Sequence, residues 1–183
     1  MGGVEVFAFE ASRTDATGLD VGQSFSRACS KAAAMPWANV DVTTAERACA
    51  DAGMQLCSAA QWERACAGDS AQAYPYGAAY AAQTCNGVDY DTDALAAGNQ
   101  DAALPTGALA QCQRTWGGAT VSDLSGNLWE WTSDDISRAR DGSVRGLRGG
   151  SFGNVSGGLT CQFVNATPAN AHRDNVGFRC CSR

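Results

Sequence analysis

The stretch DLSGNLWEWTSD, residues 123–134, decides the fold of this chain. Its second half alternates, with Glu130 between Trp129 and Trp131, and successive side chains of a β-strand point to opposite faces. The two indoles therefore predict one buried sheet face, with the Glu130 carboxylate on the other. The first half, DLSGN, favours a turn. A carboxylate beside such a core needs a partner, because an unpaired buried charge is costly.

Two helices are expected upstream of this strand. TTAE at residues 43–46 predicts a capping box that opens a helix ending near Gly53. SAAQ at residues 58–61 predicts a second box, with Gly68 as the stop. Short strand-like runs follow at 128–131, 144–147 and 176–181, and turn-forming residues dominate from Gly68 up to the first of them. The chain is therefore predicted to be one α+β domain, residues 1–183, with a loop-rich middle.

Composition limits the possible partners. The 183 residues include 13 basic and 19 acidic ones, for a net charge of -6. A nucleic-acid partner is not expected, since no field of positive charge is available for phosphates. No apolar run reaches the roughly 20 residues of a membrane-spanning helix, so membrane insertion is not expected either. An unknown protein or small-molecule ligand remains as the expected partner.

The nine cysteines accompany one histidine and include no C-x-x-C pair, which disfavours the common zinc sites. Disulfides are expected instead, and they indicate an extracellular or periplasmic location. The amino terminus, MGGVEVFAFEASR, has no basic region followed by an apolar block. Either export information was trimmed from this chain or the protein is not exported by that route. The odd count leaves at least one thiol free or paired with another chain.

The glycine-rich stretch RGGSFGNVSGGLTC, residues 148–161, permits close backbone approach to a ligand. It lacks the Lys-Ser/Thr ending of a phosphate-binding P-loop and does not follow the spacing of a dinucleotide site. Phosphate binding is therefore disfavoured, and the stretch is left to hold a reactive group or to present a surface.

Several motifs in order carry a resemblance to a known family. They are GMQLCSAAQWERAC (53–66), YPYG (74–77), DLSGNLWEWTSD (123–134), LRGGSF (147–152) and VGFRCC (176–181). Together they resemble the formylglycine-generating-enzyme, or sulfatase-modifying-factor, family, and FEASRTDAT near the start is similar to bacterial members. The resemblance implies a compact, loop-rich variant of the C-type-lectin fold.

The resemblance also implies two disulfides, Cys49 with Cys180 and Cys66 with Cys161. Two further pairs are predicted from the remaining cysteines, Cys85 with Cys112 across the loop-rich middle and Cys57 with Cys181. The neighbouring Cys180 and Cys181 point to opposite faces of a strand and so need different partners. Cys29 is left over.

A structural calcium ion is a further implication of the resemblance. Its ligands would be the side chains of Asp123 and Glu130 with the carbonyls of Leu124, Gly126 and Leu128, which suits the oxygen-rich coordination of calcium. The alternative is that Asp123 caps a turn and Glu130 meets an arginine. A second ion site of the family would fall in NGVDYDTD, residues 86–93.

The active members of the family oxidise a substrate cysteine with copper and oxygen, using two cysteines that closely follow Gly-Gly-Ser. Here the first of these positions holds Asn154, and residues 152–160 contain no cysteine. An asparagine supplies no thiolate for Cu(I). The iron-dependent branch of the fold needs three histidines, and only His172 is present. Ser151 has no adjacent base, so no catalytic residue is assigned and neither copper nor iron is expected.

A non-catalytic binding module is therefore the favoured prediction, with recognition by the loops of segment 152–175 on a rigid base. Its candidate residues are Phe152, Asn154, Val155, Leu159, Asn165, Asn170, His172 and Arg173. The phenylalanines of this segment have core packing as an alternative role. A first alternative function is a variable protein of a diversity-generating retroelement, with residues 147–179 diversified. An oxidoreductase with a divergent site and a purely structural module stay open.

Overall fold

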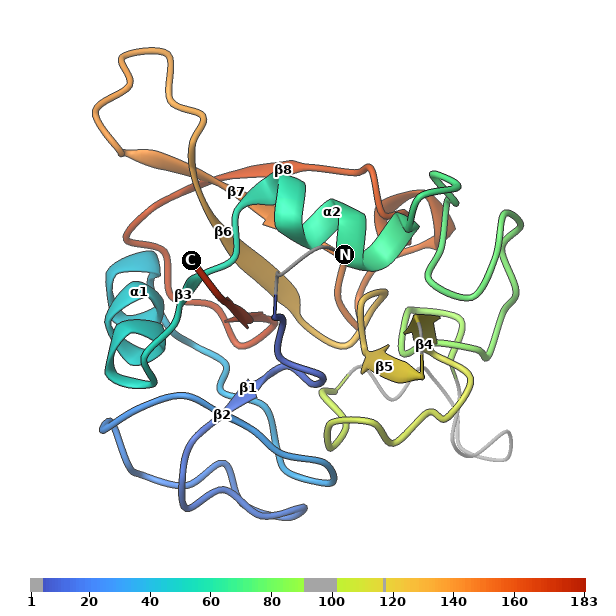
Figure 1. Cartoon of the computed structure of the whole chain (residues 1–183), viewed down its shortest axis with the longest axis horizontal. Helices are drawn as coiled ribbons and strands as arrows, with labels where there is room; N and C mark the ends of the chain where they lie inside the picture. The colour runs from blue at the N-terminus through green and yellow to red at the C-terminus, as the bar shows by residue number, and fades with distance from the viewer. Residues whose placement is uncertain (1–4, 91–101, 117) are drawn as a thin grey trace.

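The computed structural model describes residues 5–90, 102–116 and 118–183 (Figure 1). In this part of the chain the helices are α1 (Val42–Asp51), α2 (Ala59–Ala67) and the short 3-10 helix η1 (Ser156–Leu159). The strands are β1 (Ala11–Ser12), β2 (Cys29–Ser30), β3 (Gln55–Leu56), β4 (Gln113–Trp116), β5 (Ala119–Ser122), β6 (Trp129–Asp135), β7 (Val144–Arg148), β8 (Asn165–Pro168), β9 (Val176–Phe178) and β10 (Cys180–Cys181). No helix of the described residues is long and apolar enough to cross a membrane.

The main sheet has the strand order β8-β7-β6-β9, and β6 runs parallel to β9 but antiparallel to β7. Trp131 lies opposite Leu147 on one side and Phe178 on the other. Both indoles of β6 enter the core that α1 covers, where the Trp131 Nε1 donates to the Val40 carbonyl at 2.8 Å. Glu130 points to the other face, toward α2. The predicted division of the two faces is confirmed.

The second predicted helix start is confirmed, whereas the first is shifted. In α2, Gln61 N donates to Ser58 Oγ at 3.2 Å and Ser58 N donates to Gln61 Oε1 at 3.0 Å, which is a complete capping box. The capping box expected at Thr43 is wrong. α1 begins two residues earlier, because the Asp41 carboxylate accepts from Thr44 N at 2.8 Å and a carboxylate is a strong N-cap acceptor.

All four expected disulfides are present, Cys49–Cys180, Cys57–Cys181, Cys66–Cys161 and Cys85–Cys112. The two carboxy-terminal cysteines diverge to different partners, as side chains on a strand must. Cys29 on β2 is free and half-buried. Four disulfides are typical of a protein folded in an oxidising compartment.

The middle of the chain is loop-rich but contains one hairpin that was not expected. β4 and β5 pair antiparallel, with Arg114 opposite Val121. The segment was predicted as turns because Gly, Ser and Asp flank it. Pairing between Thr115 and Thr120 overrides that local preference, since β-branched residues suit paired strands.

Candidate functional site

The turn before β6 packs tightly against the backbone of Asn86. Asp123, Gly126 and Asn127 all have positive φ, of 61°, 75° and 63°. A side chain at Gly126 would bring its Cβ to 2.2 Å from the Asn86 carbonyl oxygen, so only glycine fits there. Asn127 N donates to that same oxygen at 2.7 Å. The turn therefore has a fixed shape.

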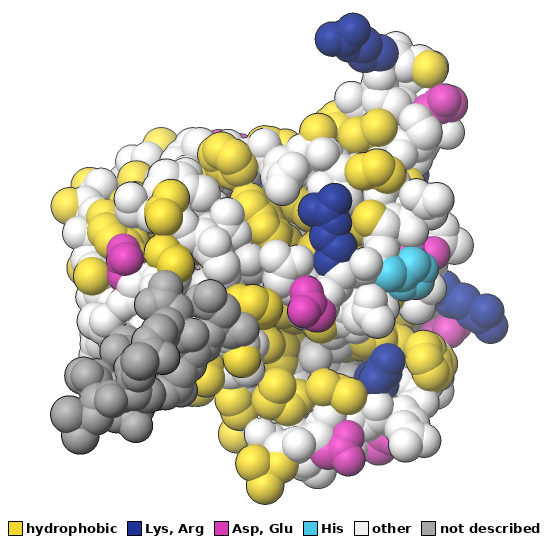
Figure 2. Space-filling view, turned by 180° about the vertical axis from the view of Figure 1, so that it is seen from behind, with side chains coloured by type: hydrophobic (Ala, Val, Ile, Leu, Met, Phe, Trp, Pro, Cys, Tyr) yellow, Lys and Arg dark blue, Asp and Glu magenta, His cyan; other side chains and the backbone are white. Residues whose placement is uncertain are grey.

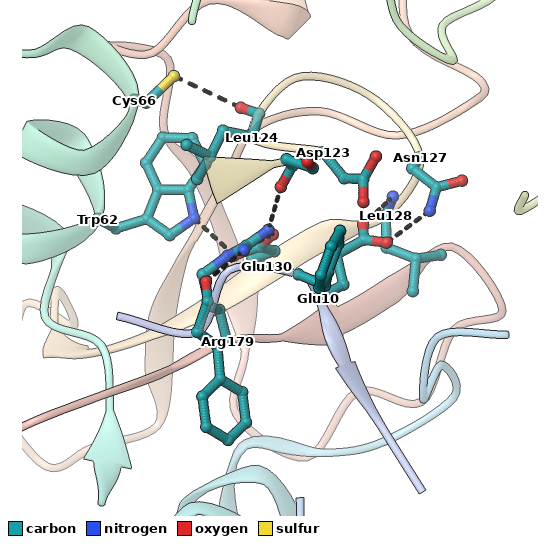
Figure 3. A network of polar contacts seen from close by, with 12 residues as sticks. Glu10, Trp62, Cys66, Asp123, Leu124, Asn127, Leu128, Glu130 and Arg179 are labelled. Carbon is teal, nitrogen blue, oxygen red and sulfur yellow. Dashed lines mark hydrogen bonds and ion pairs between the residues drawn. The ribbon is translucent and has the colours of Figure 1, made fainter. Parts of the chain in front are cut away.

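Glu130 and Arg179 form a fully buried ion pair beneath this turn (Figure 3). The Arg179 Nη2 lies 2.9 Å from Glu130 Oε1, and its Nε lies 3.1 Å from Oε2. Trp62 of α2 donates its Nε1 proton to Oε2 at 2.6 Å. Both oxygens of the carboxylate are thus engaged by two donor side chains from different elements.

The rest of the Arg179 guanidinium ties the two ends of the chain to the turn. Its Nη1 donates to the Phe7 carbonyl at 2.7 Å and its Nη2 to the Ser122 carbonyl at 2.8 Å. Burial lowers the pKa of Arg179, but the charges of Glu130, Glu10 and Asp123 and the hydrogen bond to Glu130 together outweigh it, so the net pKa is raised. The guanidinium therefore stays protonated and acts as the central cation of the domain.

Two further buried carboxylates surround this pair. Glu10 accepts from Leu128 N at 2.9 Å and from the Asn127 side chain. Asp123 accepts from Gly107 N at 2.7 Å. Burial raises the pKa of Glu10 well above its usual range, and burial with the nearby Glu130 charge raises that of Asp123 to about 6, against the hydrogen bond from Gly107. Three acidic groups thus share one arginine.

Glu130 is paired with an arginine, which was the alternative to calcium binding considered from the sequence. Calcium needs six to eight oxygen ligands, and Glu130 can offer one only by releasing Arg179 or Trp62. In this arrangement the motif does not fit a calcium ion at Glu130. Calcium binding by this protein stays a prediction from the sequence.

The second predicted ion site falls partly outside the described residues, because Asp91 and Asp93 are not described. Asn86 is buried and donates its side-chain amide to Asn127 Oδ1 and to the Ala102 carbonyl, each at 2.9 Å. Asp89 accepts from the Tyr80 hydroxyl at 2.8 Å. The described part of this segment therefore uses its polar groups within the chain.

The glycine-rich loop after β7 is closed by its own hydrogen bonds. Gly150 has a φ of 73°, and a Cβ there would lie 2.6 Å from the Gly158 carbonyl oxygen. Asn154 Oδ1 accepts from both the backbone N and the Oγ of Ser151 at 2.9 Å. Asn175 donates to that Oγ at 3.1 Å. The residue at the position of the family's first cysteine thus holds the loop together.

No thiol is available in this loop. Cys161, the first cysteine after Gly-Gly-Ser, is bonded to Cys66, and both are fully buried. The free cysteine of the described residues, Cys29, lies on β2, where its backbone is opposite that of Ser12 on β1. The arrangement therefore supplies neither of the two thiolates that the family chemistry needs.

The predicted recognition residues divide into two groups and one exception. Val155 is 64% exposed on the loop after β7, beside the half-buried Phe152 and Asn154. Asn165 lies on β8, and Asn170, His172 and Arg173 are exposed beyond it. Figure 2 shows the face with the one histidine, on which single charged side chains lie among apolar ones.

Leu159 is the exception, and its assignment to the surface is wrong. It is 1% exposed, because the short helix η1 turns it inward. There it fills the space that side chains at Gly87 and Gly150 would occupy. Phe163 is 43% exposed and packs on Trp129 with 5.8 Å between ring centroids, so it combines the two roles considered for it.

Sequence reasoning missed Glu10 and Trp62 as members of the buried network. One signal existed, since Arg179 stands between Phe178 and Cys180 in a strand-like run and a charged residue there needs a partner.

Sequence reasoning also missed a cluster of tyrosines beside the glycine-rich loop. Tyr74 stacks on Tyr76 with 5.3 Å between ring centroids, and Tyr74 donates to the Ser156 carbonyl of the loop at 3.1 Å.

Comparisons with known proteins agree with the motifs. The model of the "Sulfatase-modifying factor enzyme 1-like domain" matches residues 9–183. A curated relative from Bos taurus, "Inactive C-alpha-formylglycine-generating enzyme 2", is 32% identical over 157 residues, which cover 80% of this chain and 50% of that protein. The chain thus spans about half the length of that relative.

Solved structures share the fold at low sequence identity. "Treponema denticola variable protein 1" matches with a TM-score of 0.67 and 13% identity, over 98% of this chain and 84% of that one. CarF matches with a TM-score of 0.65 and 16% identity, over 98% and 85%. PvdO from Pseudomonas aeruginosa matches with a TM-score of 0.60 and 19% identity, over 87% and 69%. These likenesses establish a fold of the formylglycine-generating-enzyme type, related to C-type lectins.

Proposed function

Since the chain belongs to the sulfatase-modifying factor enzyme 1-like family, we propose that it is a non-catalytic member that binds a ligand outside the cell or in the periplasm. Segment 152–175 supplies the recognition surface. One observation carries the non-catalytic part. The first cysteine after Gly-Gly-Ser, Cys161, is locked to Cys66, and Asn154 occupies the position that would need a thiolate.

Two further observations support the proposal. The relative from Bos taurus is named as an inactive enzyme, and it is 32% identical to this chain over 157 residues. The scaffold under the segment is held by four disulfides and by a buried ion pair, which suits loops that carry specificity on a rigid base. The exposed side chains of Val155 and Arg173 lie on that base, available to a ligand.

The enzymatic alternative is tested with the oxidised protein, Cu(I), oxygen and a cysteine-containing sulfatase peptide. Mass spectrometry should find no formylglycine, while an active family enzyme converts the peptide in parallel. A Cys29→Ser variant removes adventitious copper binding by the free thiol. Adding Asn154→Cys to that variant restores one thiol of the family site and is the matched control for copper binding. Formylglycine formation by the unmodified chain would overturn the proposal.

The binding surface is tested on panels of immobilised glycans and cell-surface proteins. A Val155→Asp/Arg173→Glu variant should lose whatever binding the unmodified chain shows. An Arg64→Glu variant, changed on the exposed surface of α2, should keep it. Equal binding by both variants would contradict a recognition role for segment 152–175.

A second candidate is a diversified receptor encoded with a diversity-generating retroelement. The observation that favours it is the shared fold with a protein named as a variable protein of Treponema denticola. Segment 147–179 would be the diversified part, and it includes the exposed Val155, Phe163 and Val164. Sequencing the gene and its neighbourhood tests this candidate. A near-identical template repeat that differs only at adenine positions is expected, and its absence would remove the candidate.

A further inference from the structure

A cavity in the amino-terminal half suggests a second binding site, which stands whether or not segment 152–175 binds a ligand. It has a volume of about 290 Å³ and opens beside the first turns of α1. Its lining consists of Phe25, Trp37, Thr43, Thr44, Arg47 and Ala48. The lining therefore combines two aromatic rings, two hydroxyls and one guanidinium.

The aromatic wall of this cavity is held in place although it faces solvent. Phe25 is 68% exposed, yet its ring packs edge-to-face on the buried Trp37 with 5.6 Å between centroids. The Arg13 guanidinium carbon lies 4.8 Å from the Phe25 centroid and 4.9 Å from that of Trp37. Arg13 is itself anchored, since its Nη1 donates to the Gly22 carbonyl at 2.7 Å. A fixed, exposed ring is a preorganised surface for another flat apolar group.

The charge beside the ring is positive. The lining residues include Arg47 and no carboxylate. The Arg47 side chain is 83% exposed, and its nearest acidic partner is Asp51 at 3.8 Å, a weak pair within the helix. Arg13 also keeps a buried Nε that has no acceptor among the described residues. An anionic group on a ligand would thus meet an available guanidinium, for which carboxylates are well matched in geometry.

We propose that the cavity between Phe25 and α1 binds a small aromatic carboxylate. The ligand ring lies against Phe25, and its carboxylate is paired with Arg47 at the mouth of the cavity. The Thr43 hydroxyl of α1 offers a hydrogen bond to a polar substituent. A ligand with one ring and one carboxylate suits the aromatic wall and the single lining cation better than a polyanion does.

The probe is 4-fluorobenzoate, followed by ¹⁹F NMR with the full oxidised chain. Broadening of its resonance is expected, together with reversal by excess unlabelled benzoate. Arg47→Gln should weaken binding about tenfold, the effect of losing one charge-assisted contact. Phe25→Leu keeps the apolar volume over Trp37 but removes the flat face, and it should weaken binding as well. Arg138→Gln, changed on an exposed loop outside the cavity, is the matched control.

Circular dichroism confirms that each variant is folded before its affinity is compared. Absence of broadening by the unmodified chain would overturn the proposal. Broadening by the Arg47→Gln and Phe25→Leu variants as strong as that by the unmodified chain would overturn it too, because the probe would then bind elsewhere. Loss of binding in Phe25→Leu alone would exclude the carboxylate as the recognised group and so overturn the assigned ligand class.

Discussion

The buried network under β6 and the segment that follows β7 differ in how far their side chains are exposed. Glu10, Glu130 and Arg179 are fully buried, and each is engaged by named partners. Val155 and Phe163, in the second region, are 64% and 43% exposed. In the first region a substitution leaves charges without partners, whereas in the second it changes mainly what the surface presents.

Replacing the central cation should have the largest effect. Arg179→Met leaves Glu130 buried without its ion-pair partner, and removal of one partner of a buried pair costs about 3–5 kcal/mol. Val155→Asp should stay within about 0.5 kcal/mol, as expected for an exposed position. Urea unfolding of the oxidised proteins measures both differences.

A double variant separates charge from packing in that experiment. Glu130→Gln/Arg179→Met removes both charges of the pair, so it should unfold at a higher urea concentration than Arg179→Met alone. If the single and double variants are equally unstable, the loss comes from the contacts of Arg179 with the Phe7 and Ser122 carbonyls instead.

The disulfides should come next. Replacing Cys66 and Cys161 by alanine should cost about 2–5 kcal/mol, because this bridge closes a long loop and ties α2 to segment 152–175. The Cys85→Ala/Cys112→Ala variant should lose less, since its sequence separation is 27 against 95. Urea unfolding gives the order. A larger loss for the shorter bridge would mean that local packing, rather than loop entropy, sets the effect.

The excess of buried acids predicts an unusual dependence of stability on pH. The folded pKa of Asp123, about 6, lies above its ordinary value, and that of Glu10 is also raised. The folded state therefore holds more protons than the unfolded state between about pH 4 and 6, so stability rises as the pH falls through this window. The gain from Asp123, whose pKa is raised from 3.8 to about 6, is on the order of 3 kcal/mol.

Asp123→Asn is the matched variant for the pH experiment. The amide oxygen can still accept from Gly107 N, but the group no longer titrates. The variant should be more stable than the unmodified chain at pH 7 and show a flatter profile between pH 4 and 6. Identical profiles for the two proteins would show that Asp123 is ionised in the fold throughout this range.

Much of this architecture is readable from local patterns, and the failures have physical reasons. The faces of Trp129 and Trp131 follow from strand alternation, and the capping box of Ser58 follows from side-chain chemistry over three residues. The pairing of Glu130 with Arg179 joins positions 49 residues apart, so no local pattern specifies it. The sequence required only that Glu130 have some partner, and calcium and an arginine both satisfied that requirement.

The surface was harder to predict than the core for a related reason. Leu159 follows Ser156, Gly157 and Gly158, and such a run predicts an exposed loop. Its burial depends on the space left by Gly150 in the same loop and by Gly87, which is far away in the sequence. The exposed Phe25 is stabilised by Arg13 and Trp37 in a comparable way. Local composition predicts exposure poorly where distant glycines or cations determine the packing.

Calcium should have the smallest effect on the unmodified chain. The melting midpoint is expected to be the same in calcium and in EDTA, because both oxygens of Glu130 are engaged by Arg179 and Trp62. Arg179→Met sharpens this test, since it frees Glu130 beside Asp123 and should make the midpoint respond to calcium. Magnesium, which prefers a stricter octahedral geometry, serves as the control ion. A lower midpoint of the unmodified chain in EDTA would mean that an ion competes with Arg179 for Glu130, and the calcium ligands expected from the motif would then stand.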